Sequence, residues 1–266
     1  MVTDGIREGI FTHVSAAVFC STEGGKGILI DAGRTAKQIE QALKTNNLDP
    51  KNIEGIFITH EHSDHIKGVR VFASRYGINV YASQGTLEQM DTQGHLTPEK
   101  FNSYIINSGA EAGGMIIKPF QISHDCAEGL GYVVETPDNR RLAIATDTGY
   151  LSDEIKTAIK GCDVVIIESN HDVNMLLNGS YPYMLKRRIL SNIGHLSNET
   201  CSEFLPHLIR SGTTRLLLAH LSQENNMPQI ALESARCSLL QKGMKEATDY
   251  TLGVAKEVTD GSCIIF

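Results

Sequence analysis

The sequence of 266 residues has no apolar run that approaches the roughly 20 residues needed to span a membrane. Its first residues, MVTDGIREGIF, contain neither a basic segment nor an apolar stretch of signal-peptide length. We therefore predict a cytoplasmic protein with no membrane partner.

Paired cysteines are also missing, because the six cysteines are scattered and none forms a C-x-x-C motif. In a chain that is not exported, this pattern predicts reduced thiols rather than a disulfide framework. Positive charge is scarce as well, since the formal net charge is -7. Nonspecific nucleic-acid affinity depends on neutralising phosphates, so this balance argues against a general nucleic-acid-binding surface but leaves room for a local basic patch.

No low-complexity tract, charge block, internal repeat or Pro/Ser-rich linker interrupts the chain. With 41% hydrophobic and 21% charged residues, it has the composition of a globular protein. The length predicts a single domain over residues 1–266. The oligomeric state stays open.

Short apolar runs with the character of β-strands recur along the chain, and segments of helical periodicity lie between some of them. The predicted strands cover residues 16–19, 27–33, 55–60, 78–83, 115–124, 131–136, 141–149, 163–169 and 215–221. The predicted helices cover residues 35–46, 66–77, 151–160, 183–191, 198–211 and 228–242. Strands dominate the early part and alternate with helices later, which predicts an α/β fold of four layers, an αββα sandwich, rather than a doubly wound parallel sheet.

A histidine or a carboxylate follows several of these apolar runs directly. These strand-end residues are Asp31, His60, His124, Asp147, Glu168 and His220. Strand ends at one edge of a sheet can converge in space, so the pattern predicts one common site.

The segment ITHEHSDHIKG, residues 58–68, crowds three histidines and two carboxylates into six consecutive positions. If it runs extended beyond the strand, His60, His62 and Asp64 lie on one side, and His65 reaches the same pocket from the start of the next helix. Imidazoles with a carboxylate suit zinc or manganese, and also iron. A solvated loop or a hydrogen-bonded core histidine would account for one histidine, but H-x-H-x-D-H between a strand and a helix favours metal binding.

One segment does not complete two metal shells, so the strand-end residues are candidates for the remaining ligands. We predict two divalent ions, the first bound by His60, His62 and His124 and the second by Asp64, His65 and His220, with Asp147 between them. Asp31 is predicted to accept a hydrogen bond from a ligating imidazole, as carboxylates commonly do. For His124, Asp147, His220 and Asp31, which lie outside the motif, the alternative is that each only caps the end of its strand.

The motif THEHSDH, with IDAG upstream and SHD, ATDTG and LAHLS downstream, resembles the metallo-β-lactamase superfamily from about residue 14 to the C-terminus. The resemblance implies an αββα sandwich with a dinuclear metal site at one edge. The strings HEHSDHIKGV, ATDTGY, ESNHDV, YPYMLKRRILS, GHLSNE and LAHLSQENN are similar to the YycJ (WalJ) branch, which implies 5′ to 3′ exonuclease activity on double-stranded DNA rather than on RNA. The segment HVSAAVFCSTEGGKG departs from the Gly/Ser-rich turn at which the family usually begins, so the substrate contacts of that turn stay open.

The succession IIES, GHLSNE and LLLAHLS is similar to the tail of the tRNA 3′-processing nucleases of this superfamily. That similarity makes Glu168 the residue that orients His195, and His195 the proton donor to the leaving group. A carboxylate partner raises the pKa of an imidazole, which suits this role. His195 also precedes a helix start with Ser197 at the cap, so a structural role is the alternative reading.

The basic run LKRRI supplies Lys186, Arg187 and Arg188 between two motifs of the predicted site. We predict that these cations, together with His171, bind a polyanionic substrate. The alternatives are that the basic run forms a solvated helix face and that His171 is part of a structural turn.

The expected chemistry is phosphodiester hydrolysis by a metal-bridging hydroxide, with Asp64 as an essential ligand, metal stabilisation of the developing charge and protonation of the leaving oxygen by His195. A thioesterase or lactonase of the same superfamily shares the ligands but needs neither an oriented proton donor nor a basic run. A flavo-diiron reductase would have Glu in place of His62 and a flavin domain. A noncatalytic regulatory or binding protein would typically have lost a ligand, and every candidate ligand is present.

Overall fold

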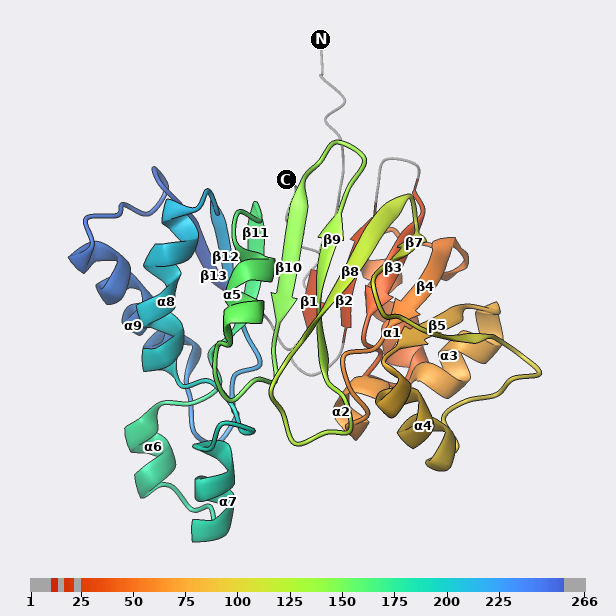
Figure 1. Ribbon diagram of the computed structural model, residues 1–266, viewed down its shortest axis with the longest axis horizontal. Helices are drawn as coiled ribbons and strands as arrows, with labels where there is room; N and C mark the ends of the chain where they lie inside the picture. Colours follow the sequence, from red (N-terminus) through yellow and green to blue (C-terminus); the bar gives the residue numbers. More distant parts are fainter. Residues whose placement is uncertain (1–10, 14–16, 22–24, 256–266) are drawn as a thin grey trace.

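The computed structural model describes residues 11–13, 17–21 and 25–255. Two β-sheets face each other and helices cover both outer faces (Figure 1). The predicted αββα sandwich is therefore confirmed. The departure from the family pattern in HVSAAVFCSTEGGKG falls partly on residues 14–16 and 22–24, which lie outside the described residues.

The first sheet has six strands in the order β1-β2-β3-β4-β5-β6. Its strands β1 to β3 are antiparallel, whereas β3 to β6 run parallel. The strands are β1 (Phe11–His13), β2 (Ala17–Ser21), β3 (Gly27–Ile30), β4 (Ile53–Phe57), β5 (Asn79–Ala82) and β6 (Ser103–Ile105).

The second sheet has seven strands in the order β13-β12-β11-β10-β9-β8-β7. Strands β10 to β13 are parallel, and β7 to β10 are antiparallel neighbours, so β8 points the same way as β10. The strands are β7 (Ala110–Ala112), β8 (Met115–Gln121), β9 (Leu130–Glu135), β10 (Arg141–Ala145), β11 (Val164–Glu168), β12 (Arg215–Ala219) and β13 (Thr251–Val254).

The helices begin where the sequence supplies capping side chains. Thr35 and Gln38 form a capping box at the start of α1, and Ser197 accepts a hydrogen bond from the backbone of Thr200 in α8. The helices are α1 (Ala36–Thr45), α2 (Ser63–Ile66), α3 (Val69–Tyr76), α4 (Gln84–Thr92), α5 (Asp153–Ile159), α6 (Val173–Asn178), α7 (Tyr183–Ile189), α8 (Asn198–Arg210) and α9 (Pro228–Gln241), with the 3-10 turn η1 (Pro50–Asn52).

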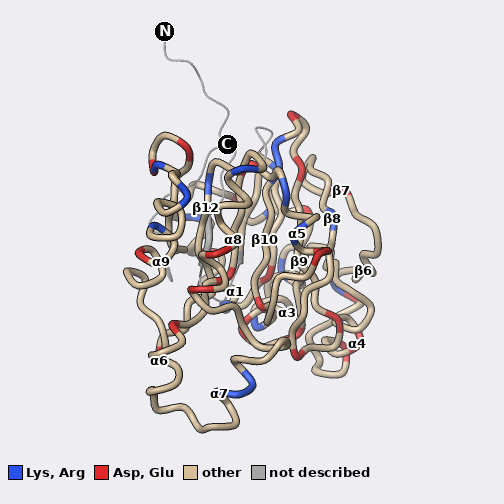
Figure 2. Tube along the Cα trace, turned by 60° about the vertical axis from the view of Figure 1, so that its left-hand side comes forward, with Lys and Arg blue, Asp and Glu red and all other residues tan. Residues whose placement is uncertain are grey.

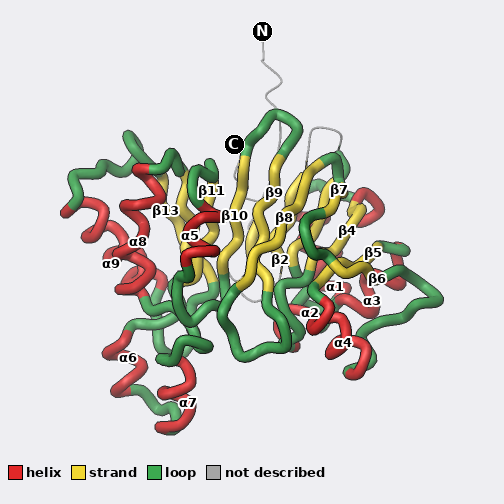
Figure 3. Tube along the Cα trace, in the orientation of Figure 1, coloured by secondary structure: helices red, strands yellow, loops and turns green. Residues whose placement is uncertain are grey.

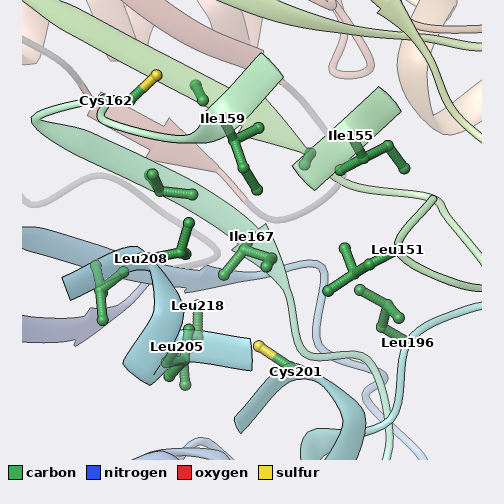
Figure 4. Close-up of a cluster of buried hydrophobic side chains, with 14 of the residues drawn as sticks. Leu151, Ile155, Ile159, Cys162, Ile167, Leu196, Cys201, Leu205, Leu208 and Leu218 are labelled. Atoms are coloured by element: carbon green, nitrogen blue, oxygen red, sulfur yellow. The ribbon is translucent and has the colours of Figure 1, made fainter. Parts of the chain in front are cut away.

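Alternation along the central strands builds three apolar clusters between the four layers. Ile144 and Ile166 point between the sheets, whereas Ala143 and Val165 point outward to the cluster under α5, α8 and α9. Figure 4 shows part of this outer cluster, with Leu205 of α8 close to the second sheet. Helices α1, α3 and α4 cover the first sheet in the same way. The central strands of both sheets, such as β3, β10 and β11, are therefore buried on both faces, which explains their continuous apolar runs.

The five cysteines of the described residues are free, as the sequence predicts. Within those same residues, no helix is both long enough and apolar enough to cross a membrane. Loops gather at one end of the sandwich, where α2, α6 and α7 also lie (Figure 3). The carboxyl ends of β3, β4, β8, β10, β11 and β12 open toward loops that carry the predicted strand-end residues.

Candidate metal centre

Three of the strand-end residues adopt left-handed backbone conformations. The φ angles are 62° at Asp31, 58° at Asp147 and 57° at His220. Such angles are uncommon for residues with a side chain, and they cluster at functional sites because the surrounding structure must hold them. Each turn ends a strand abruptly and keeps the polar side chain near the sheet edge.

The first group of ligand-type side chains consists of His60, His62 and His124. One nitrogen from each ring lies within 4.8 Å of the corresponding nitrogens of the other two. The ring of His60 lies 4.5 Å from that of His62 and 5.0 Å from that of His124, centroid to centroid. Three imidazoles around one point are a donor set that suits a divalent transition metal.

The second group consists of Asp64, His65 and His220, whose ligand-type atoms also lie within 4.8 Å of one another. Asp147 lies between the two groups: its Oδ2 is 3.6 Å from His65 Nε2, and its Oδ1 is 3.2 Å from His220 Nδ1. It forms a further group with His60 and His65. The structure therefore brings all seven predicted ligands together, and Asp147 and His220 form one more candidate group with Glu168 and His195.

Several atoms at the centre of this cluster are buried without a hydrogen-bond partner among the described residues. They are Nε2 of His60, Nε2 of His65 and Oδ2 of Asp147. Leaving a buried polar atom unpaired costs about 1–3 kcal/mol, so three together point to a missing partner. Because each of these atoms can donate an electron pair to a metal once it is deprotonated, the site fits divalent metal ions.

The extended conformation predicted for residues 59–64 is wrong at its end. The chain is extended only as far as His62, which caps α2, and Asp64 lies in the first turn of that helix. From this helix Asp64 belongs to the second group, whereas His62, one residue before the helix, belongs to the first. Glu61, which is in none of the ligand groups, accepts a hydrogen bond from the backbone N–H of Ala127 at 2.7 Å and joins the motif to the loop after His124.

Asp31 occupies the predicted position behind a ligand-type imidazole. Its Oδ2 lies 2.8 Å from Nδ1 of His65, and it accepts hydrogen bonds from the backbone N–H and the hydroxyl of Thr59. This arrangement fixes the ring of His65 with Nε2 facing the cluster. Sequence reasoning missed Thr59, whose hydroxyl also lies 3.1 Å from Nδ1 of His60, because a threonine inside a strand run carries no distinctive signal.

Glu168 contacts two histidines through one oxygen. Its Oε1 is 2.8 Å from Nδ1 of His195 and 2.7 Å from Nδ1 of His220. Its Oε2 accepts hydrogen bonds from the backbone N–H groups of Thr148 and Leu196. The predicted Glu168–His195 pair is present, and the carboxylate also orients His220, a contact that no sequence pattern predicted.

The charges in the site determine the protonation of its histidines. Burial lowers the pKa of His195, but the neighbouring Glu168 carboxylate outweighs it, so the net shift is upward. Burial also opposes protonation of His65, yet Asp147 and Asp31 raise the pKa of that imidazole to about 10. His60 behaves in the opposite way, because burial and the neighbouring His65 hold the pKa of its imidazole well below the usual range.

The basic run lies on α7, which projects beside α6 at the loop end of the molecule (Figure 2). Lys186 donates to the carbonyls of Leu177 and Gly179, both at 2.8 Å, and so closes the end of α6. Arg188 pairs with Asp125, the residue after His124. Arg187 lies over the ring of Tyr183, 5.9 Å from its centroid, and is the cation of the three that remains most available to a ligand.

His171 is buried, with only 1% of its surface exposed. Both of its ring nitrogens lack a hydrogen-bond partner within the described part of the chain. Burial lowers the pKa of this imidazole, so it is neutral. In this conformation His171 does not line an open surface, and its predicted substrate contact stays a prediction.

Comparison with known proteins agrees with this geometry. The family model described as the β-lactamase superfamily domain matches residues 26–221. The chain is also 40% identical over 240 residues to exodeoxyribonuclease YycJ of Bacillus anthracis, covering 88% of this chain and 87% of that one. This chain is a YycJ-like member of the metallo-β-lactamase superfamily. The YycJ-like chain is also 37% identical to exodeoxyribonuclease WalJ of Streptococcus pneumoniae over 85% of its own length and 84% of that protein.

Among solved structures, the YycJ-like chain is similar to the metallo-β-lactamase fold protein YhfI from Bacillus subtilis. The TM-score is 0.69 at 15% sequence identity, and the match covers 95% of this chain and 97% of the other. At that identity the likeness supports the fold alone. Superfamily membership and the ligand groups together support the use of divalent metal by this YycJ-like protein.

Proposed function

We propose that the protein is a divalent-metal-dependent exodeoxyribonuclease that hydrolyses the phosphodiester bonds of DNA in the 5′ to 3′ direction. The observation that carries this proposal is a buried carboxylate–imidazole pair, Glu168 and His195, beside a cluster of seven ligand-type side chains. Its relatives YycJ and WalJ are named exodeoxyribonucleases, which supports the same substrate class. Zinc and manganese suit the donor set best, and iron is the third candidate.

The proposed ligands divide as the two groups do. His60, His62 and His124 would hold one ion, Asp64, His65 and His220 the other, and Asp147 would contact both. Bound divalent ions would supply Lewis acidity and a water of lowered pKa at neutral pH. Asp31 keeps His65 in the correct orientation, and Glu168 does the same for His220.

His195 is proposed as the proton donor to the leaving sugar oxygen. Its Nδ1 faces Glu168, so Nε2 is the ring nitrogen that can face a substrate. The upward shift of its pKa favours the protonated ring that this role needs. In the overall reaction water provides the oxygen that joins phosphorus, the bond from phosphorus to the sugar oxygen breaks, and a proton from the attacking water returns to His195.

Substrate binding is proposed to use Arg187 directly. Lys186 and Arg188 support it by holding α7 against α6 and against the loop after His124. His171 would contact substrate only after a local rearrangement, since it is buried. An arginine with a free guanidinium edge can bind a phosphate through two hydrogen bonds.

The test is an assay of purified protein with labelled duplex DNA, single-stranded DNA and RNA, run beside a thioester and a lactone. We expect cleavage of DNA from the 5′ end, lost on chelation and restored by zinc or manganese. Hydrolysis of the thioester or the lactone without any cleavage of nucleic acid would replace the nuclease proposal with that of a thioesterase or lactonase.

Chelation should also lower the thermal stability. Chelation removes the ions from the folded state, and ligands that bind only the folded state stabilise it by about 3–4 kcal/mol at high saturation. For a chain of this size we expect the melting temperature to fall by about 10 °C when chelator is added and to recover with metal. An unchanged melting temperature would show that the cluster holds no ion.

A further inference from the structure

A groove on the outer face of the second sheet lies between α5 and α8. Its volume is about 650 Å³, within the range of ligand-binding pockets. Ten residues line it: Tyr150, Leu151, Lys156, Lys160, Thr200, Glu203, Phe204, His207, Leu208 and Ser211. The groove contains none of the ligand-type residues of the metal centre, so it is a separate feature.

The floor of the groove is fixed by the core. Leu151 and Leu208 are buried members of the cluster under α5 and α8, and both appear in Figure 4. These leucines give the groove an apolar floor.

The walls of the groove combine positive charge with aromatic rings. Lys156 and Lys160 are exposed one turn apart on the α5 side, and Glu203 is the acidic residue of the lining. The contact of Lys156 with Asp153 is 3.7 Å long and exposed, so it restrains the lysine little. The lining therefore offers two exposed lysines beside Glu203, with Asp153 next to Lys156.

Tyr150 and Phe204 provide the aromatic part of the lining. Tyr150 is 44% exposed, and the ring of Phe204 stacks with that of His207 at 5.8 Å and 24°. Flat rings together with lysines are the combination that single-stranded nucleic acids require, because bases stack on the rings while the phosphates pair with the cations.

The groove begins at the two loops that carry catalytic groups. Thr148 follows Asp147 in the first loop. Its backbone N–H donates a hydrogen bond to Glu168, and its hydroxyl donates one to the carbonyl of Tyr150. The other loop runs from His195 through Leu196, which also donates to Glu168, to Ser197 at the start of α8. One end of the groove is thus tied through Glu168 to the proposed proton donor.

We propose that this groove binds single-stranded DNA that continues beyond the scissile phosphate, with the phosphates on Lys156 and Lys160 and the bases against Tyr150 and Phe204. The inference rests on the proposed nuclease function. It follows from the two loops at one end of the groove, because both donate backbone hydrogen bonds to Glu168, the partner of His195. From Ser152 to Lys160 the groove wall extends about 12 Å at 1.5 Å per helical residue. At about 3.4 Å per stacked nucleotide, that length fits roughly two to four nucleotides.

The experiment compares two double variants of the full-length, metal-loaded protein. Lys156→Ala with Lys160→Ala removes the groove cations, and Lys37→Ala with Lys44→Ala removes two exposed lysines from α1, over the other sheet. The substrates are a single-stranded oligonucleotide and bis-p-nitrophenyl phosphate, which is too small to reach from the site into the groove. For the groove variant we expect the KM for the oligonucleotide to rise about 10-fold more than the KM for the small ester. The slope of log KM against log salt concentration for the oligonucleotide should also fall by about 1.4, which is about 0.7 for each of the two lost phosphate contacts.

Equal KM values and salt slopes for the groove variant and the α1 variant would overturn the inference while the nuclease function stands. A wild-type protein that cleaves the small ester but no nucleic acid would remove the proposed function and the inference with it. Thermal melting of each variant separates these outcomes from misfolding, since all four lysines are exposed and their loss should leave the melting temperature within about 2 °C of the wild type.

Discussion

Replacement of Asp64 by alanine should abolish hydrolysis and leave the fold intact. Half of the Asp64 side chain is exposed, so its loss opens no cavity in the core. Its loss removes one of three side chains in the second ligand group. Replacement of a residue that hydrogen-bonds to a metal ligand typically lowers metal affinity or activity by about 10- to 100-fold. Loss of a ligand itself should therefore lower kcat/KM by at least about 10³-fold.

The matched control is Asp91→Ala, which removes an exposed carboxylate from α4, away from the ligand groups. Both variants should give the circular dichroism spectrum of the wild type, and the control should retain its full rate. Full activity of a folded Asp64→Ala variant would exclude a mechanism in which both groups hold metal.

Replacement of His195 by alanine should slow phosphodiester cleavage by about 10² to 10⁴, the usual contribution of general acid catalysis. His195 and His220 both face Glu168 and both belong to a candidate group with Asp147, but the two groups that we assign to ions include only His220. Both ions should therefore stay bound in the His195→Ala variant. A substrate whose leaving group is a nitrophenolate needs no proton and should restore most of the rate, whereas failure of that rescue would show that His195 binds substrate or supports the structure.

Glu168→Gln offers a sharper comparison. A simple Glu–His pair would make this change milder than His195→Ala, because the imidazole remains. In the structure, however, Glu168 accepts from two backbone N–H groups at one oxygen and faces two imidazoles at the other. A carboxamide can accept at one end only, so we expect Glu168→Gln to lose metal at His220 as well as activity, and the nitrophenolate substrate to rescue it only in part.

The ligand groups could be predicted from the sequence because each member sits at a strand end or in one dense motif. Asp31, Asp147 and His220 each follow an apolar run, and parallel strands place such residues at one edge. The conformation around Asp64 could not be predicted in the same way. Whether the chain stays extended or begins a helix at Ser63 depends on tertiary contacts that alternation along a strand does not encode.

Contacts between distant segments were the other limit. Arg188 pairs with Asp125 across 63 positions of sequence, and the bond from Glu168 to His220 depends on β11 lying beside β12. The short strands β6 and β7 escaped prediction because the three residues of β6 are exposed and β7 is a short partner of β8, so neither has an apolar run. The helix α4 was missed because Leu87 and Met90 are its only buried large apolar residues.

We propose that the seven ligand-type side chains hold two divalent ions, one in each of the two groups. The most direct test is the metal content per chain of the protein purified without chelator, measured by mass spectrometry for the wild type and for His62→Ala. We expect about two ions per chain in the wild type and about one in the variant, because His62 belongs only to the group with His60 and His124. A fully active wild type that contains no divalent metal would contradict it.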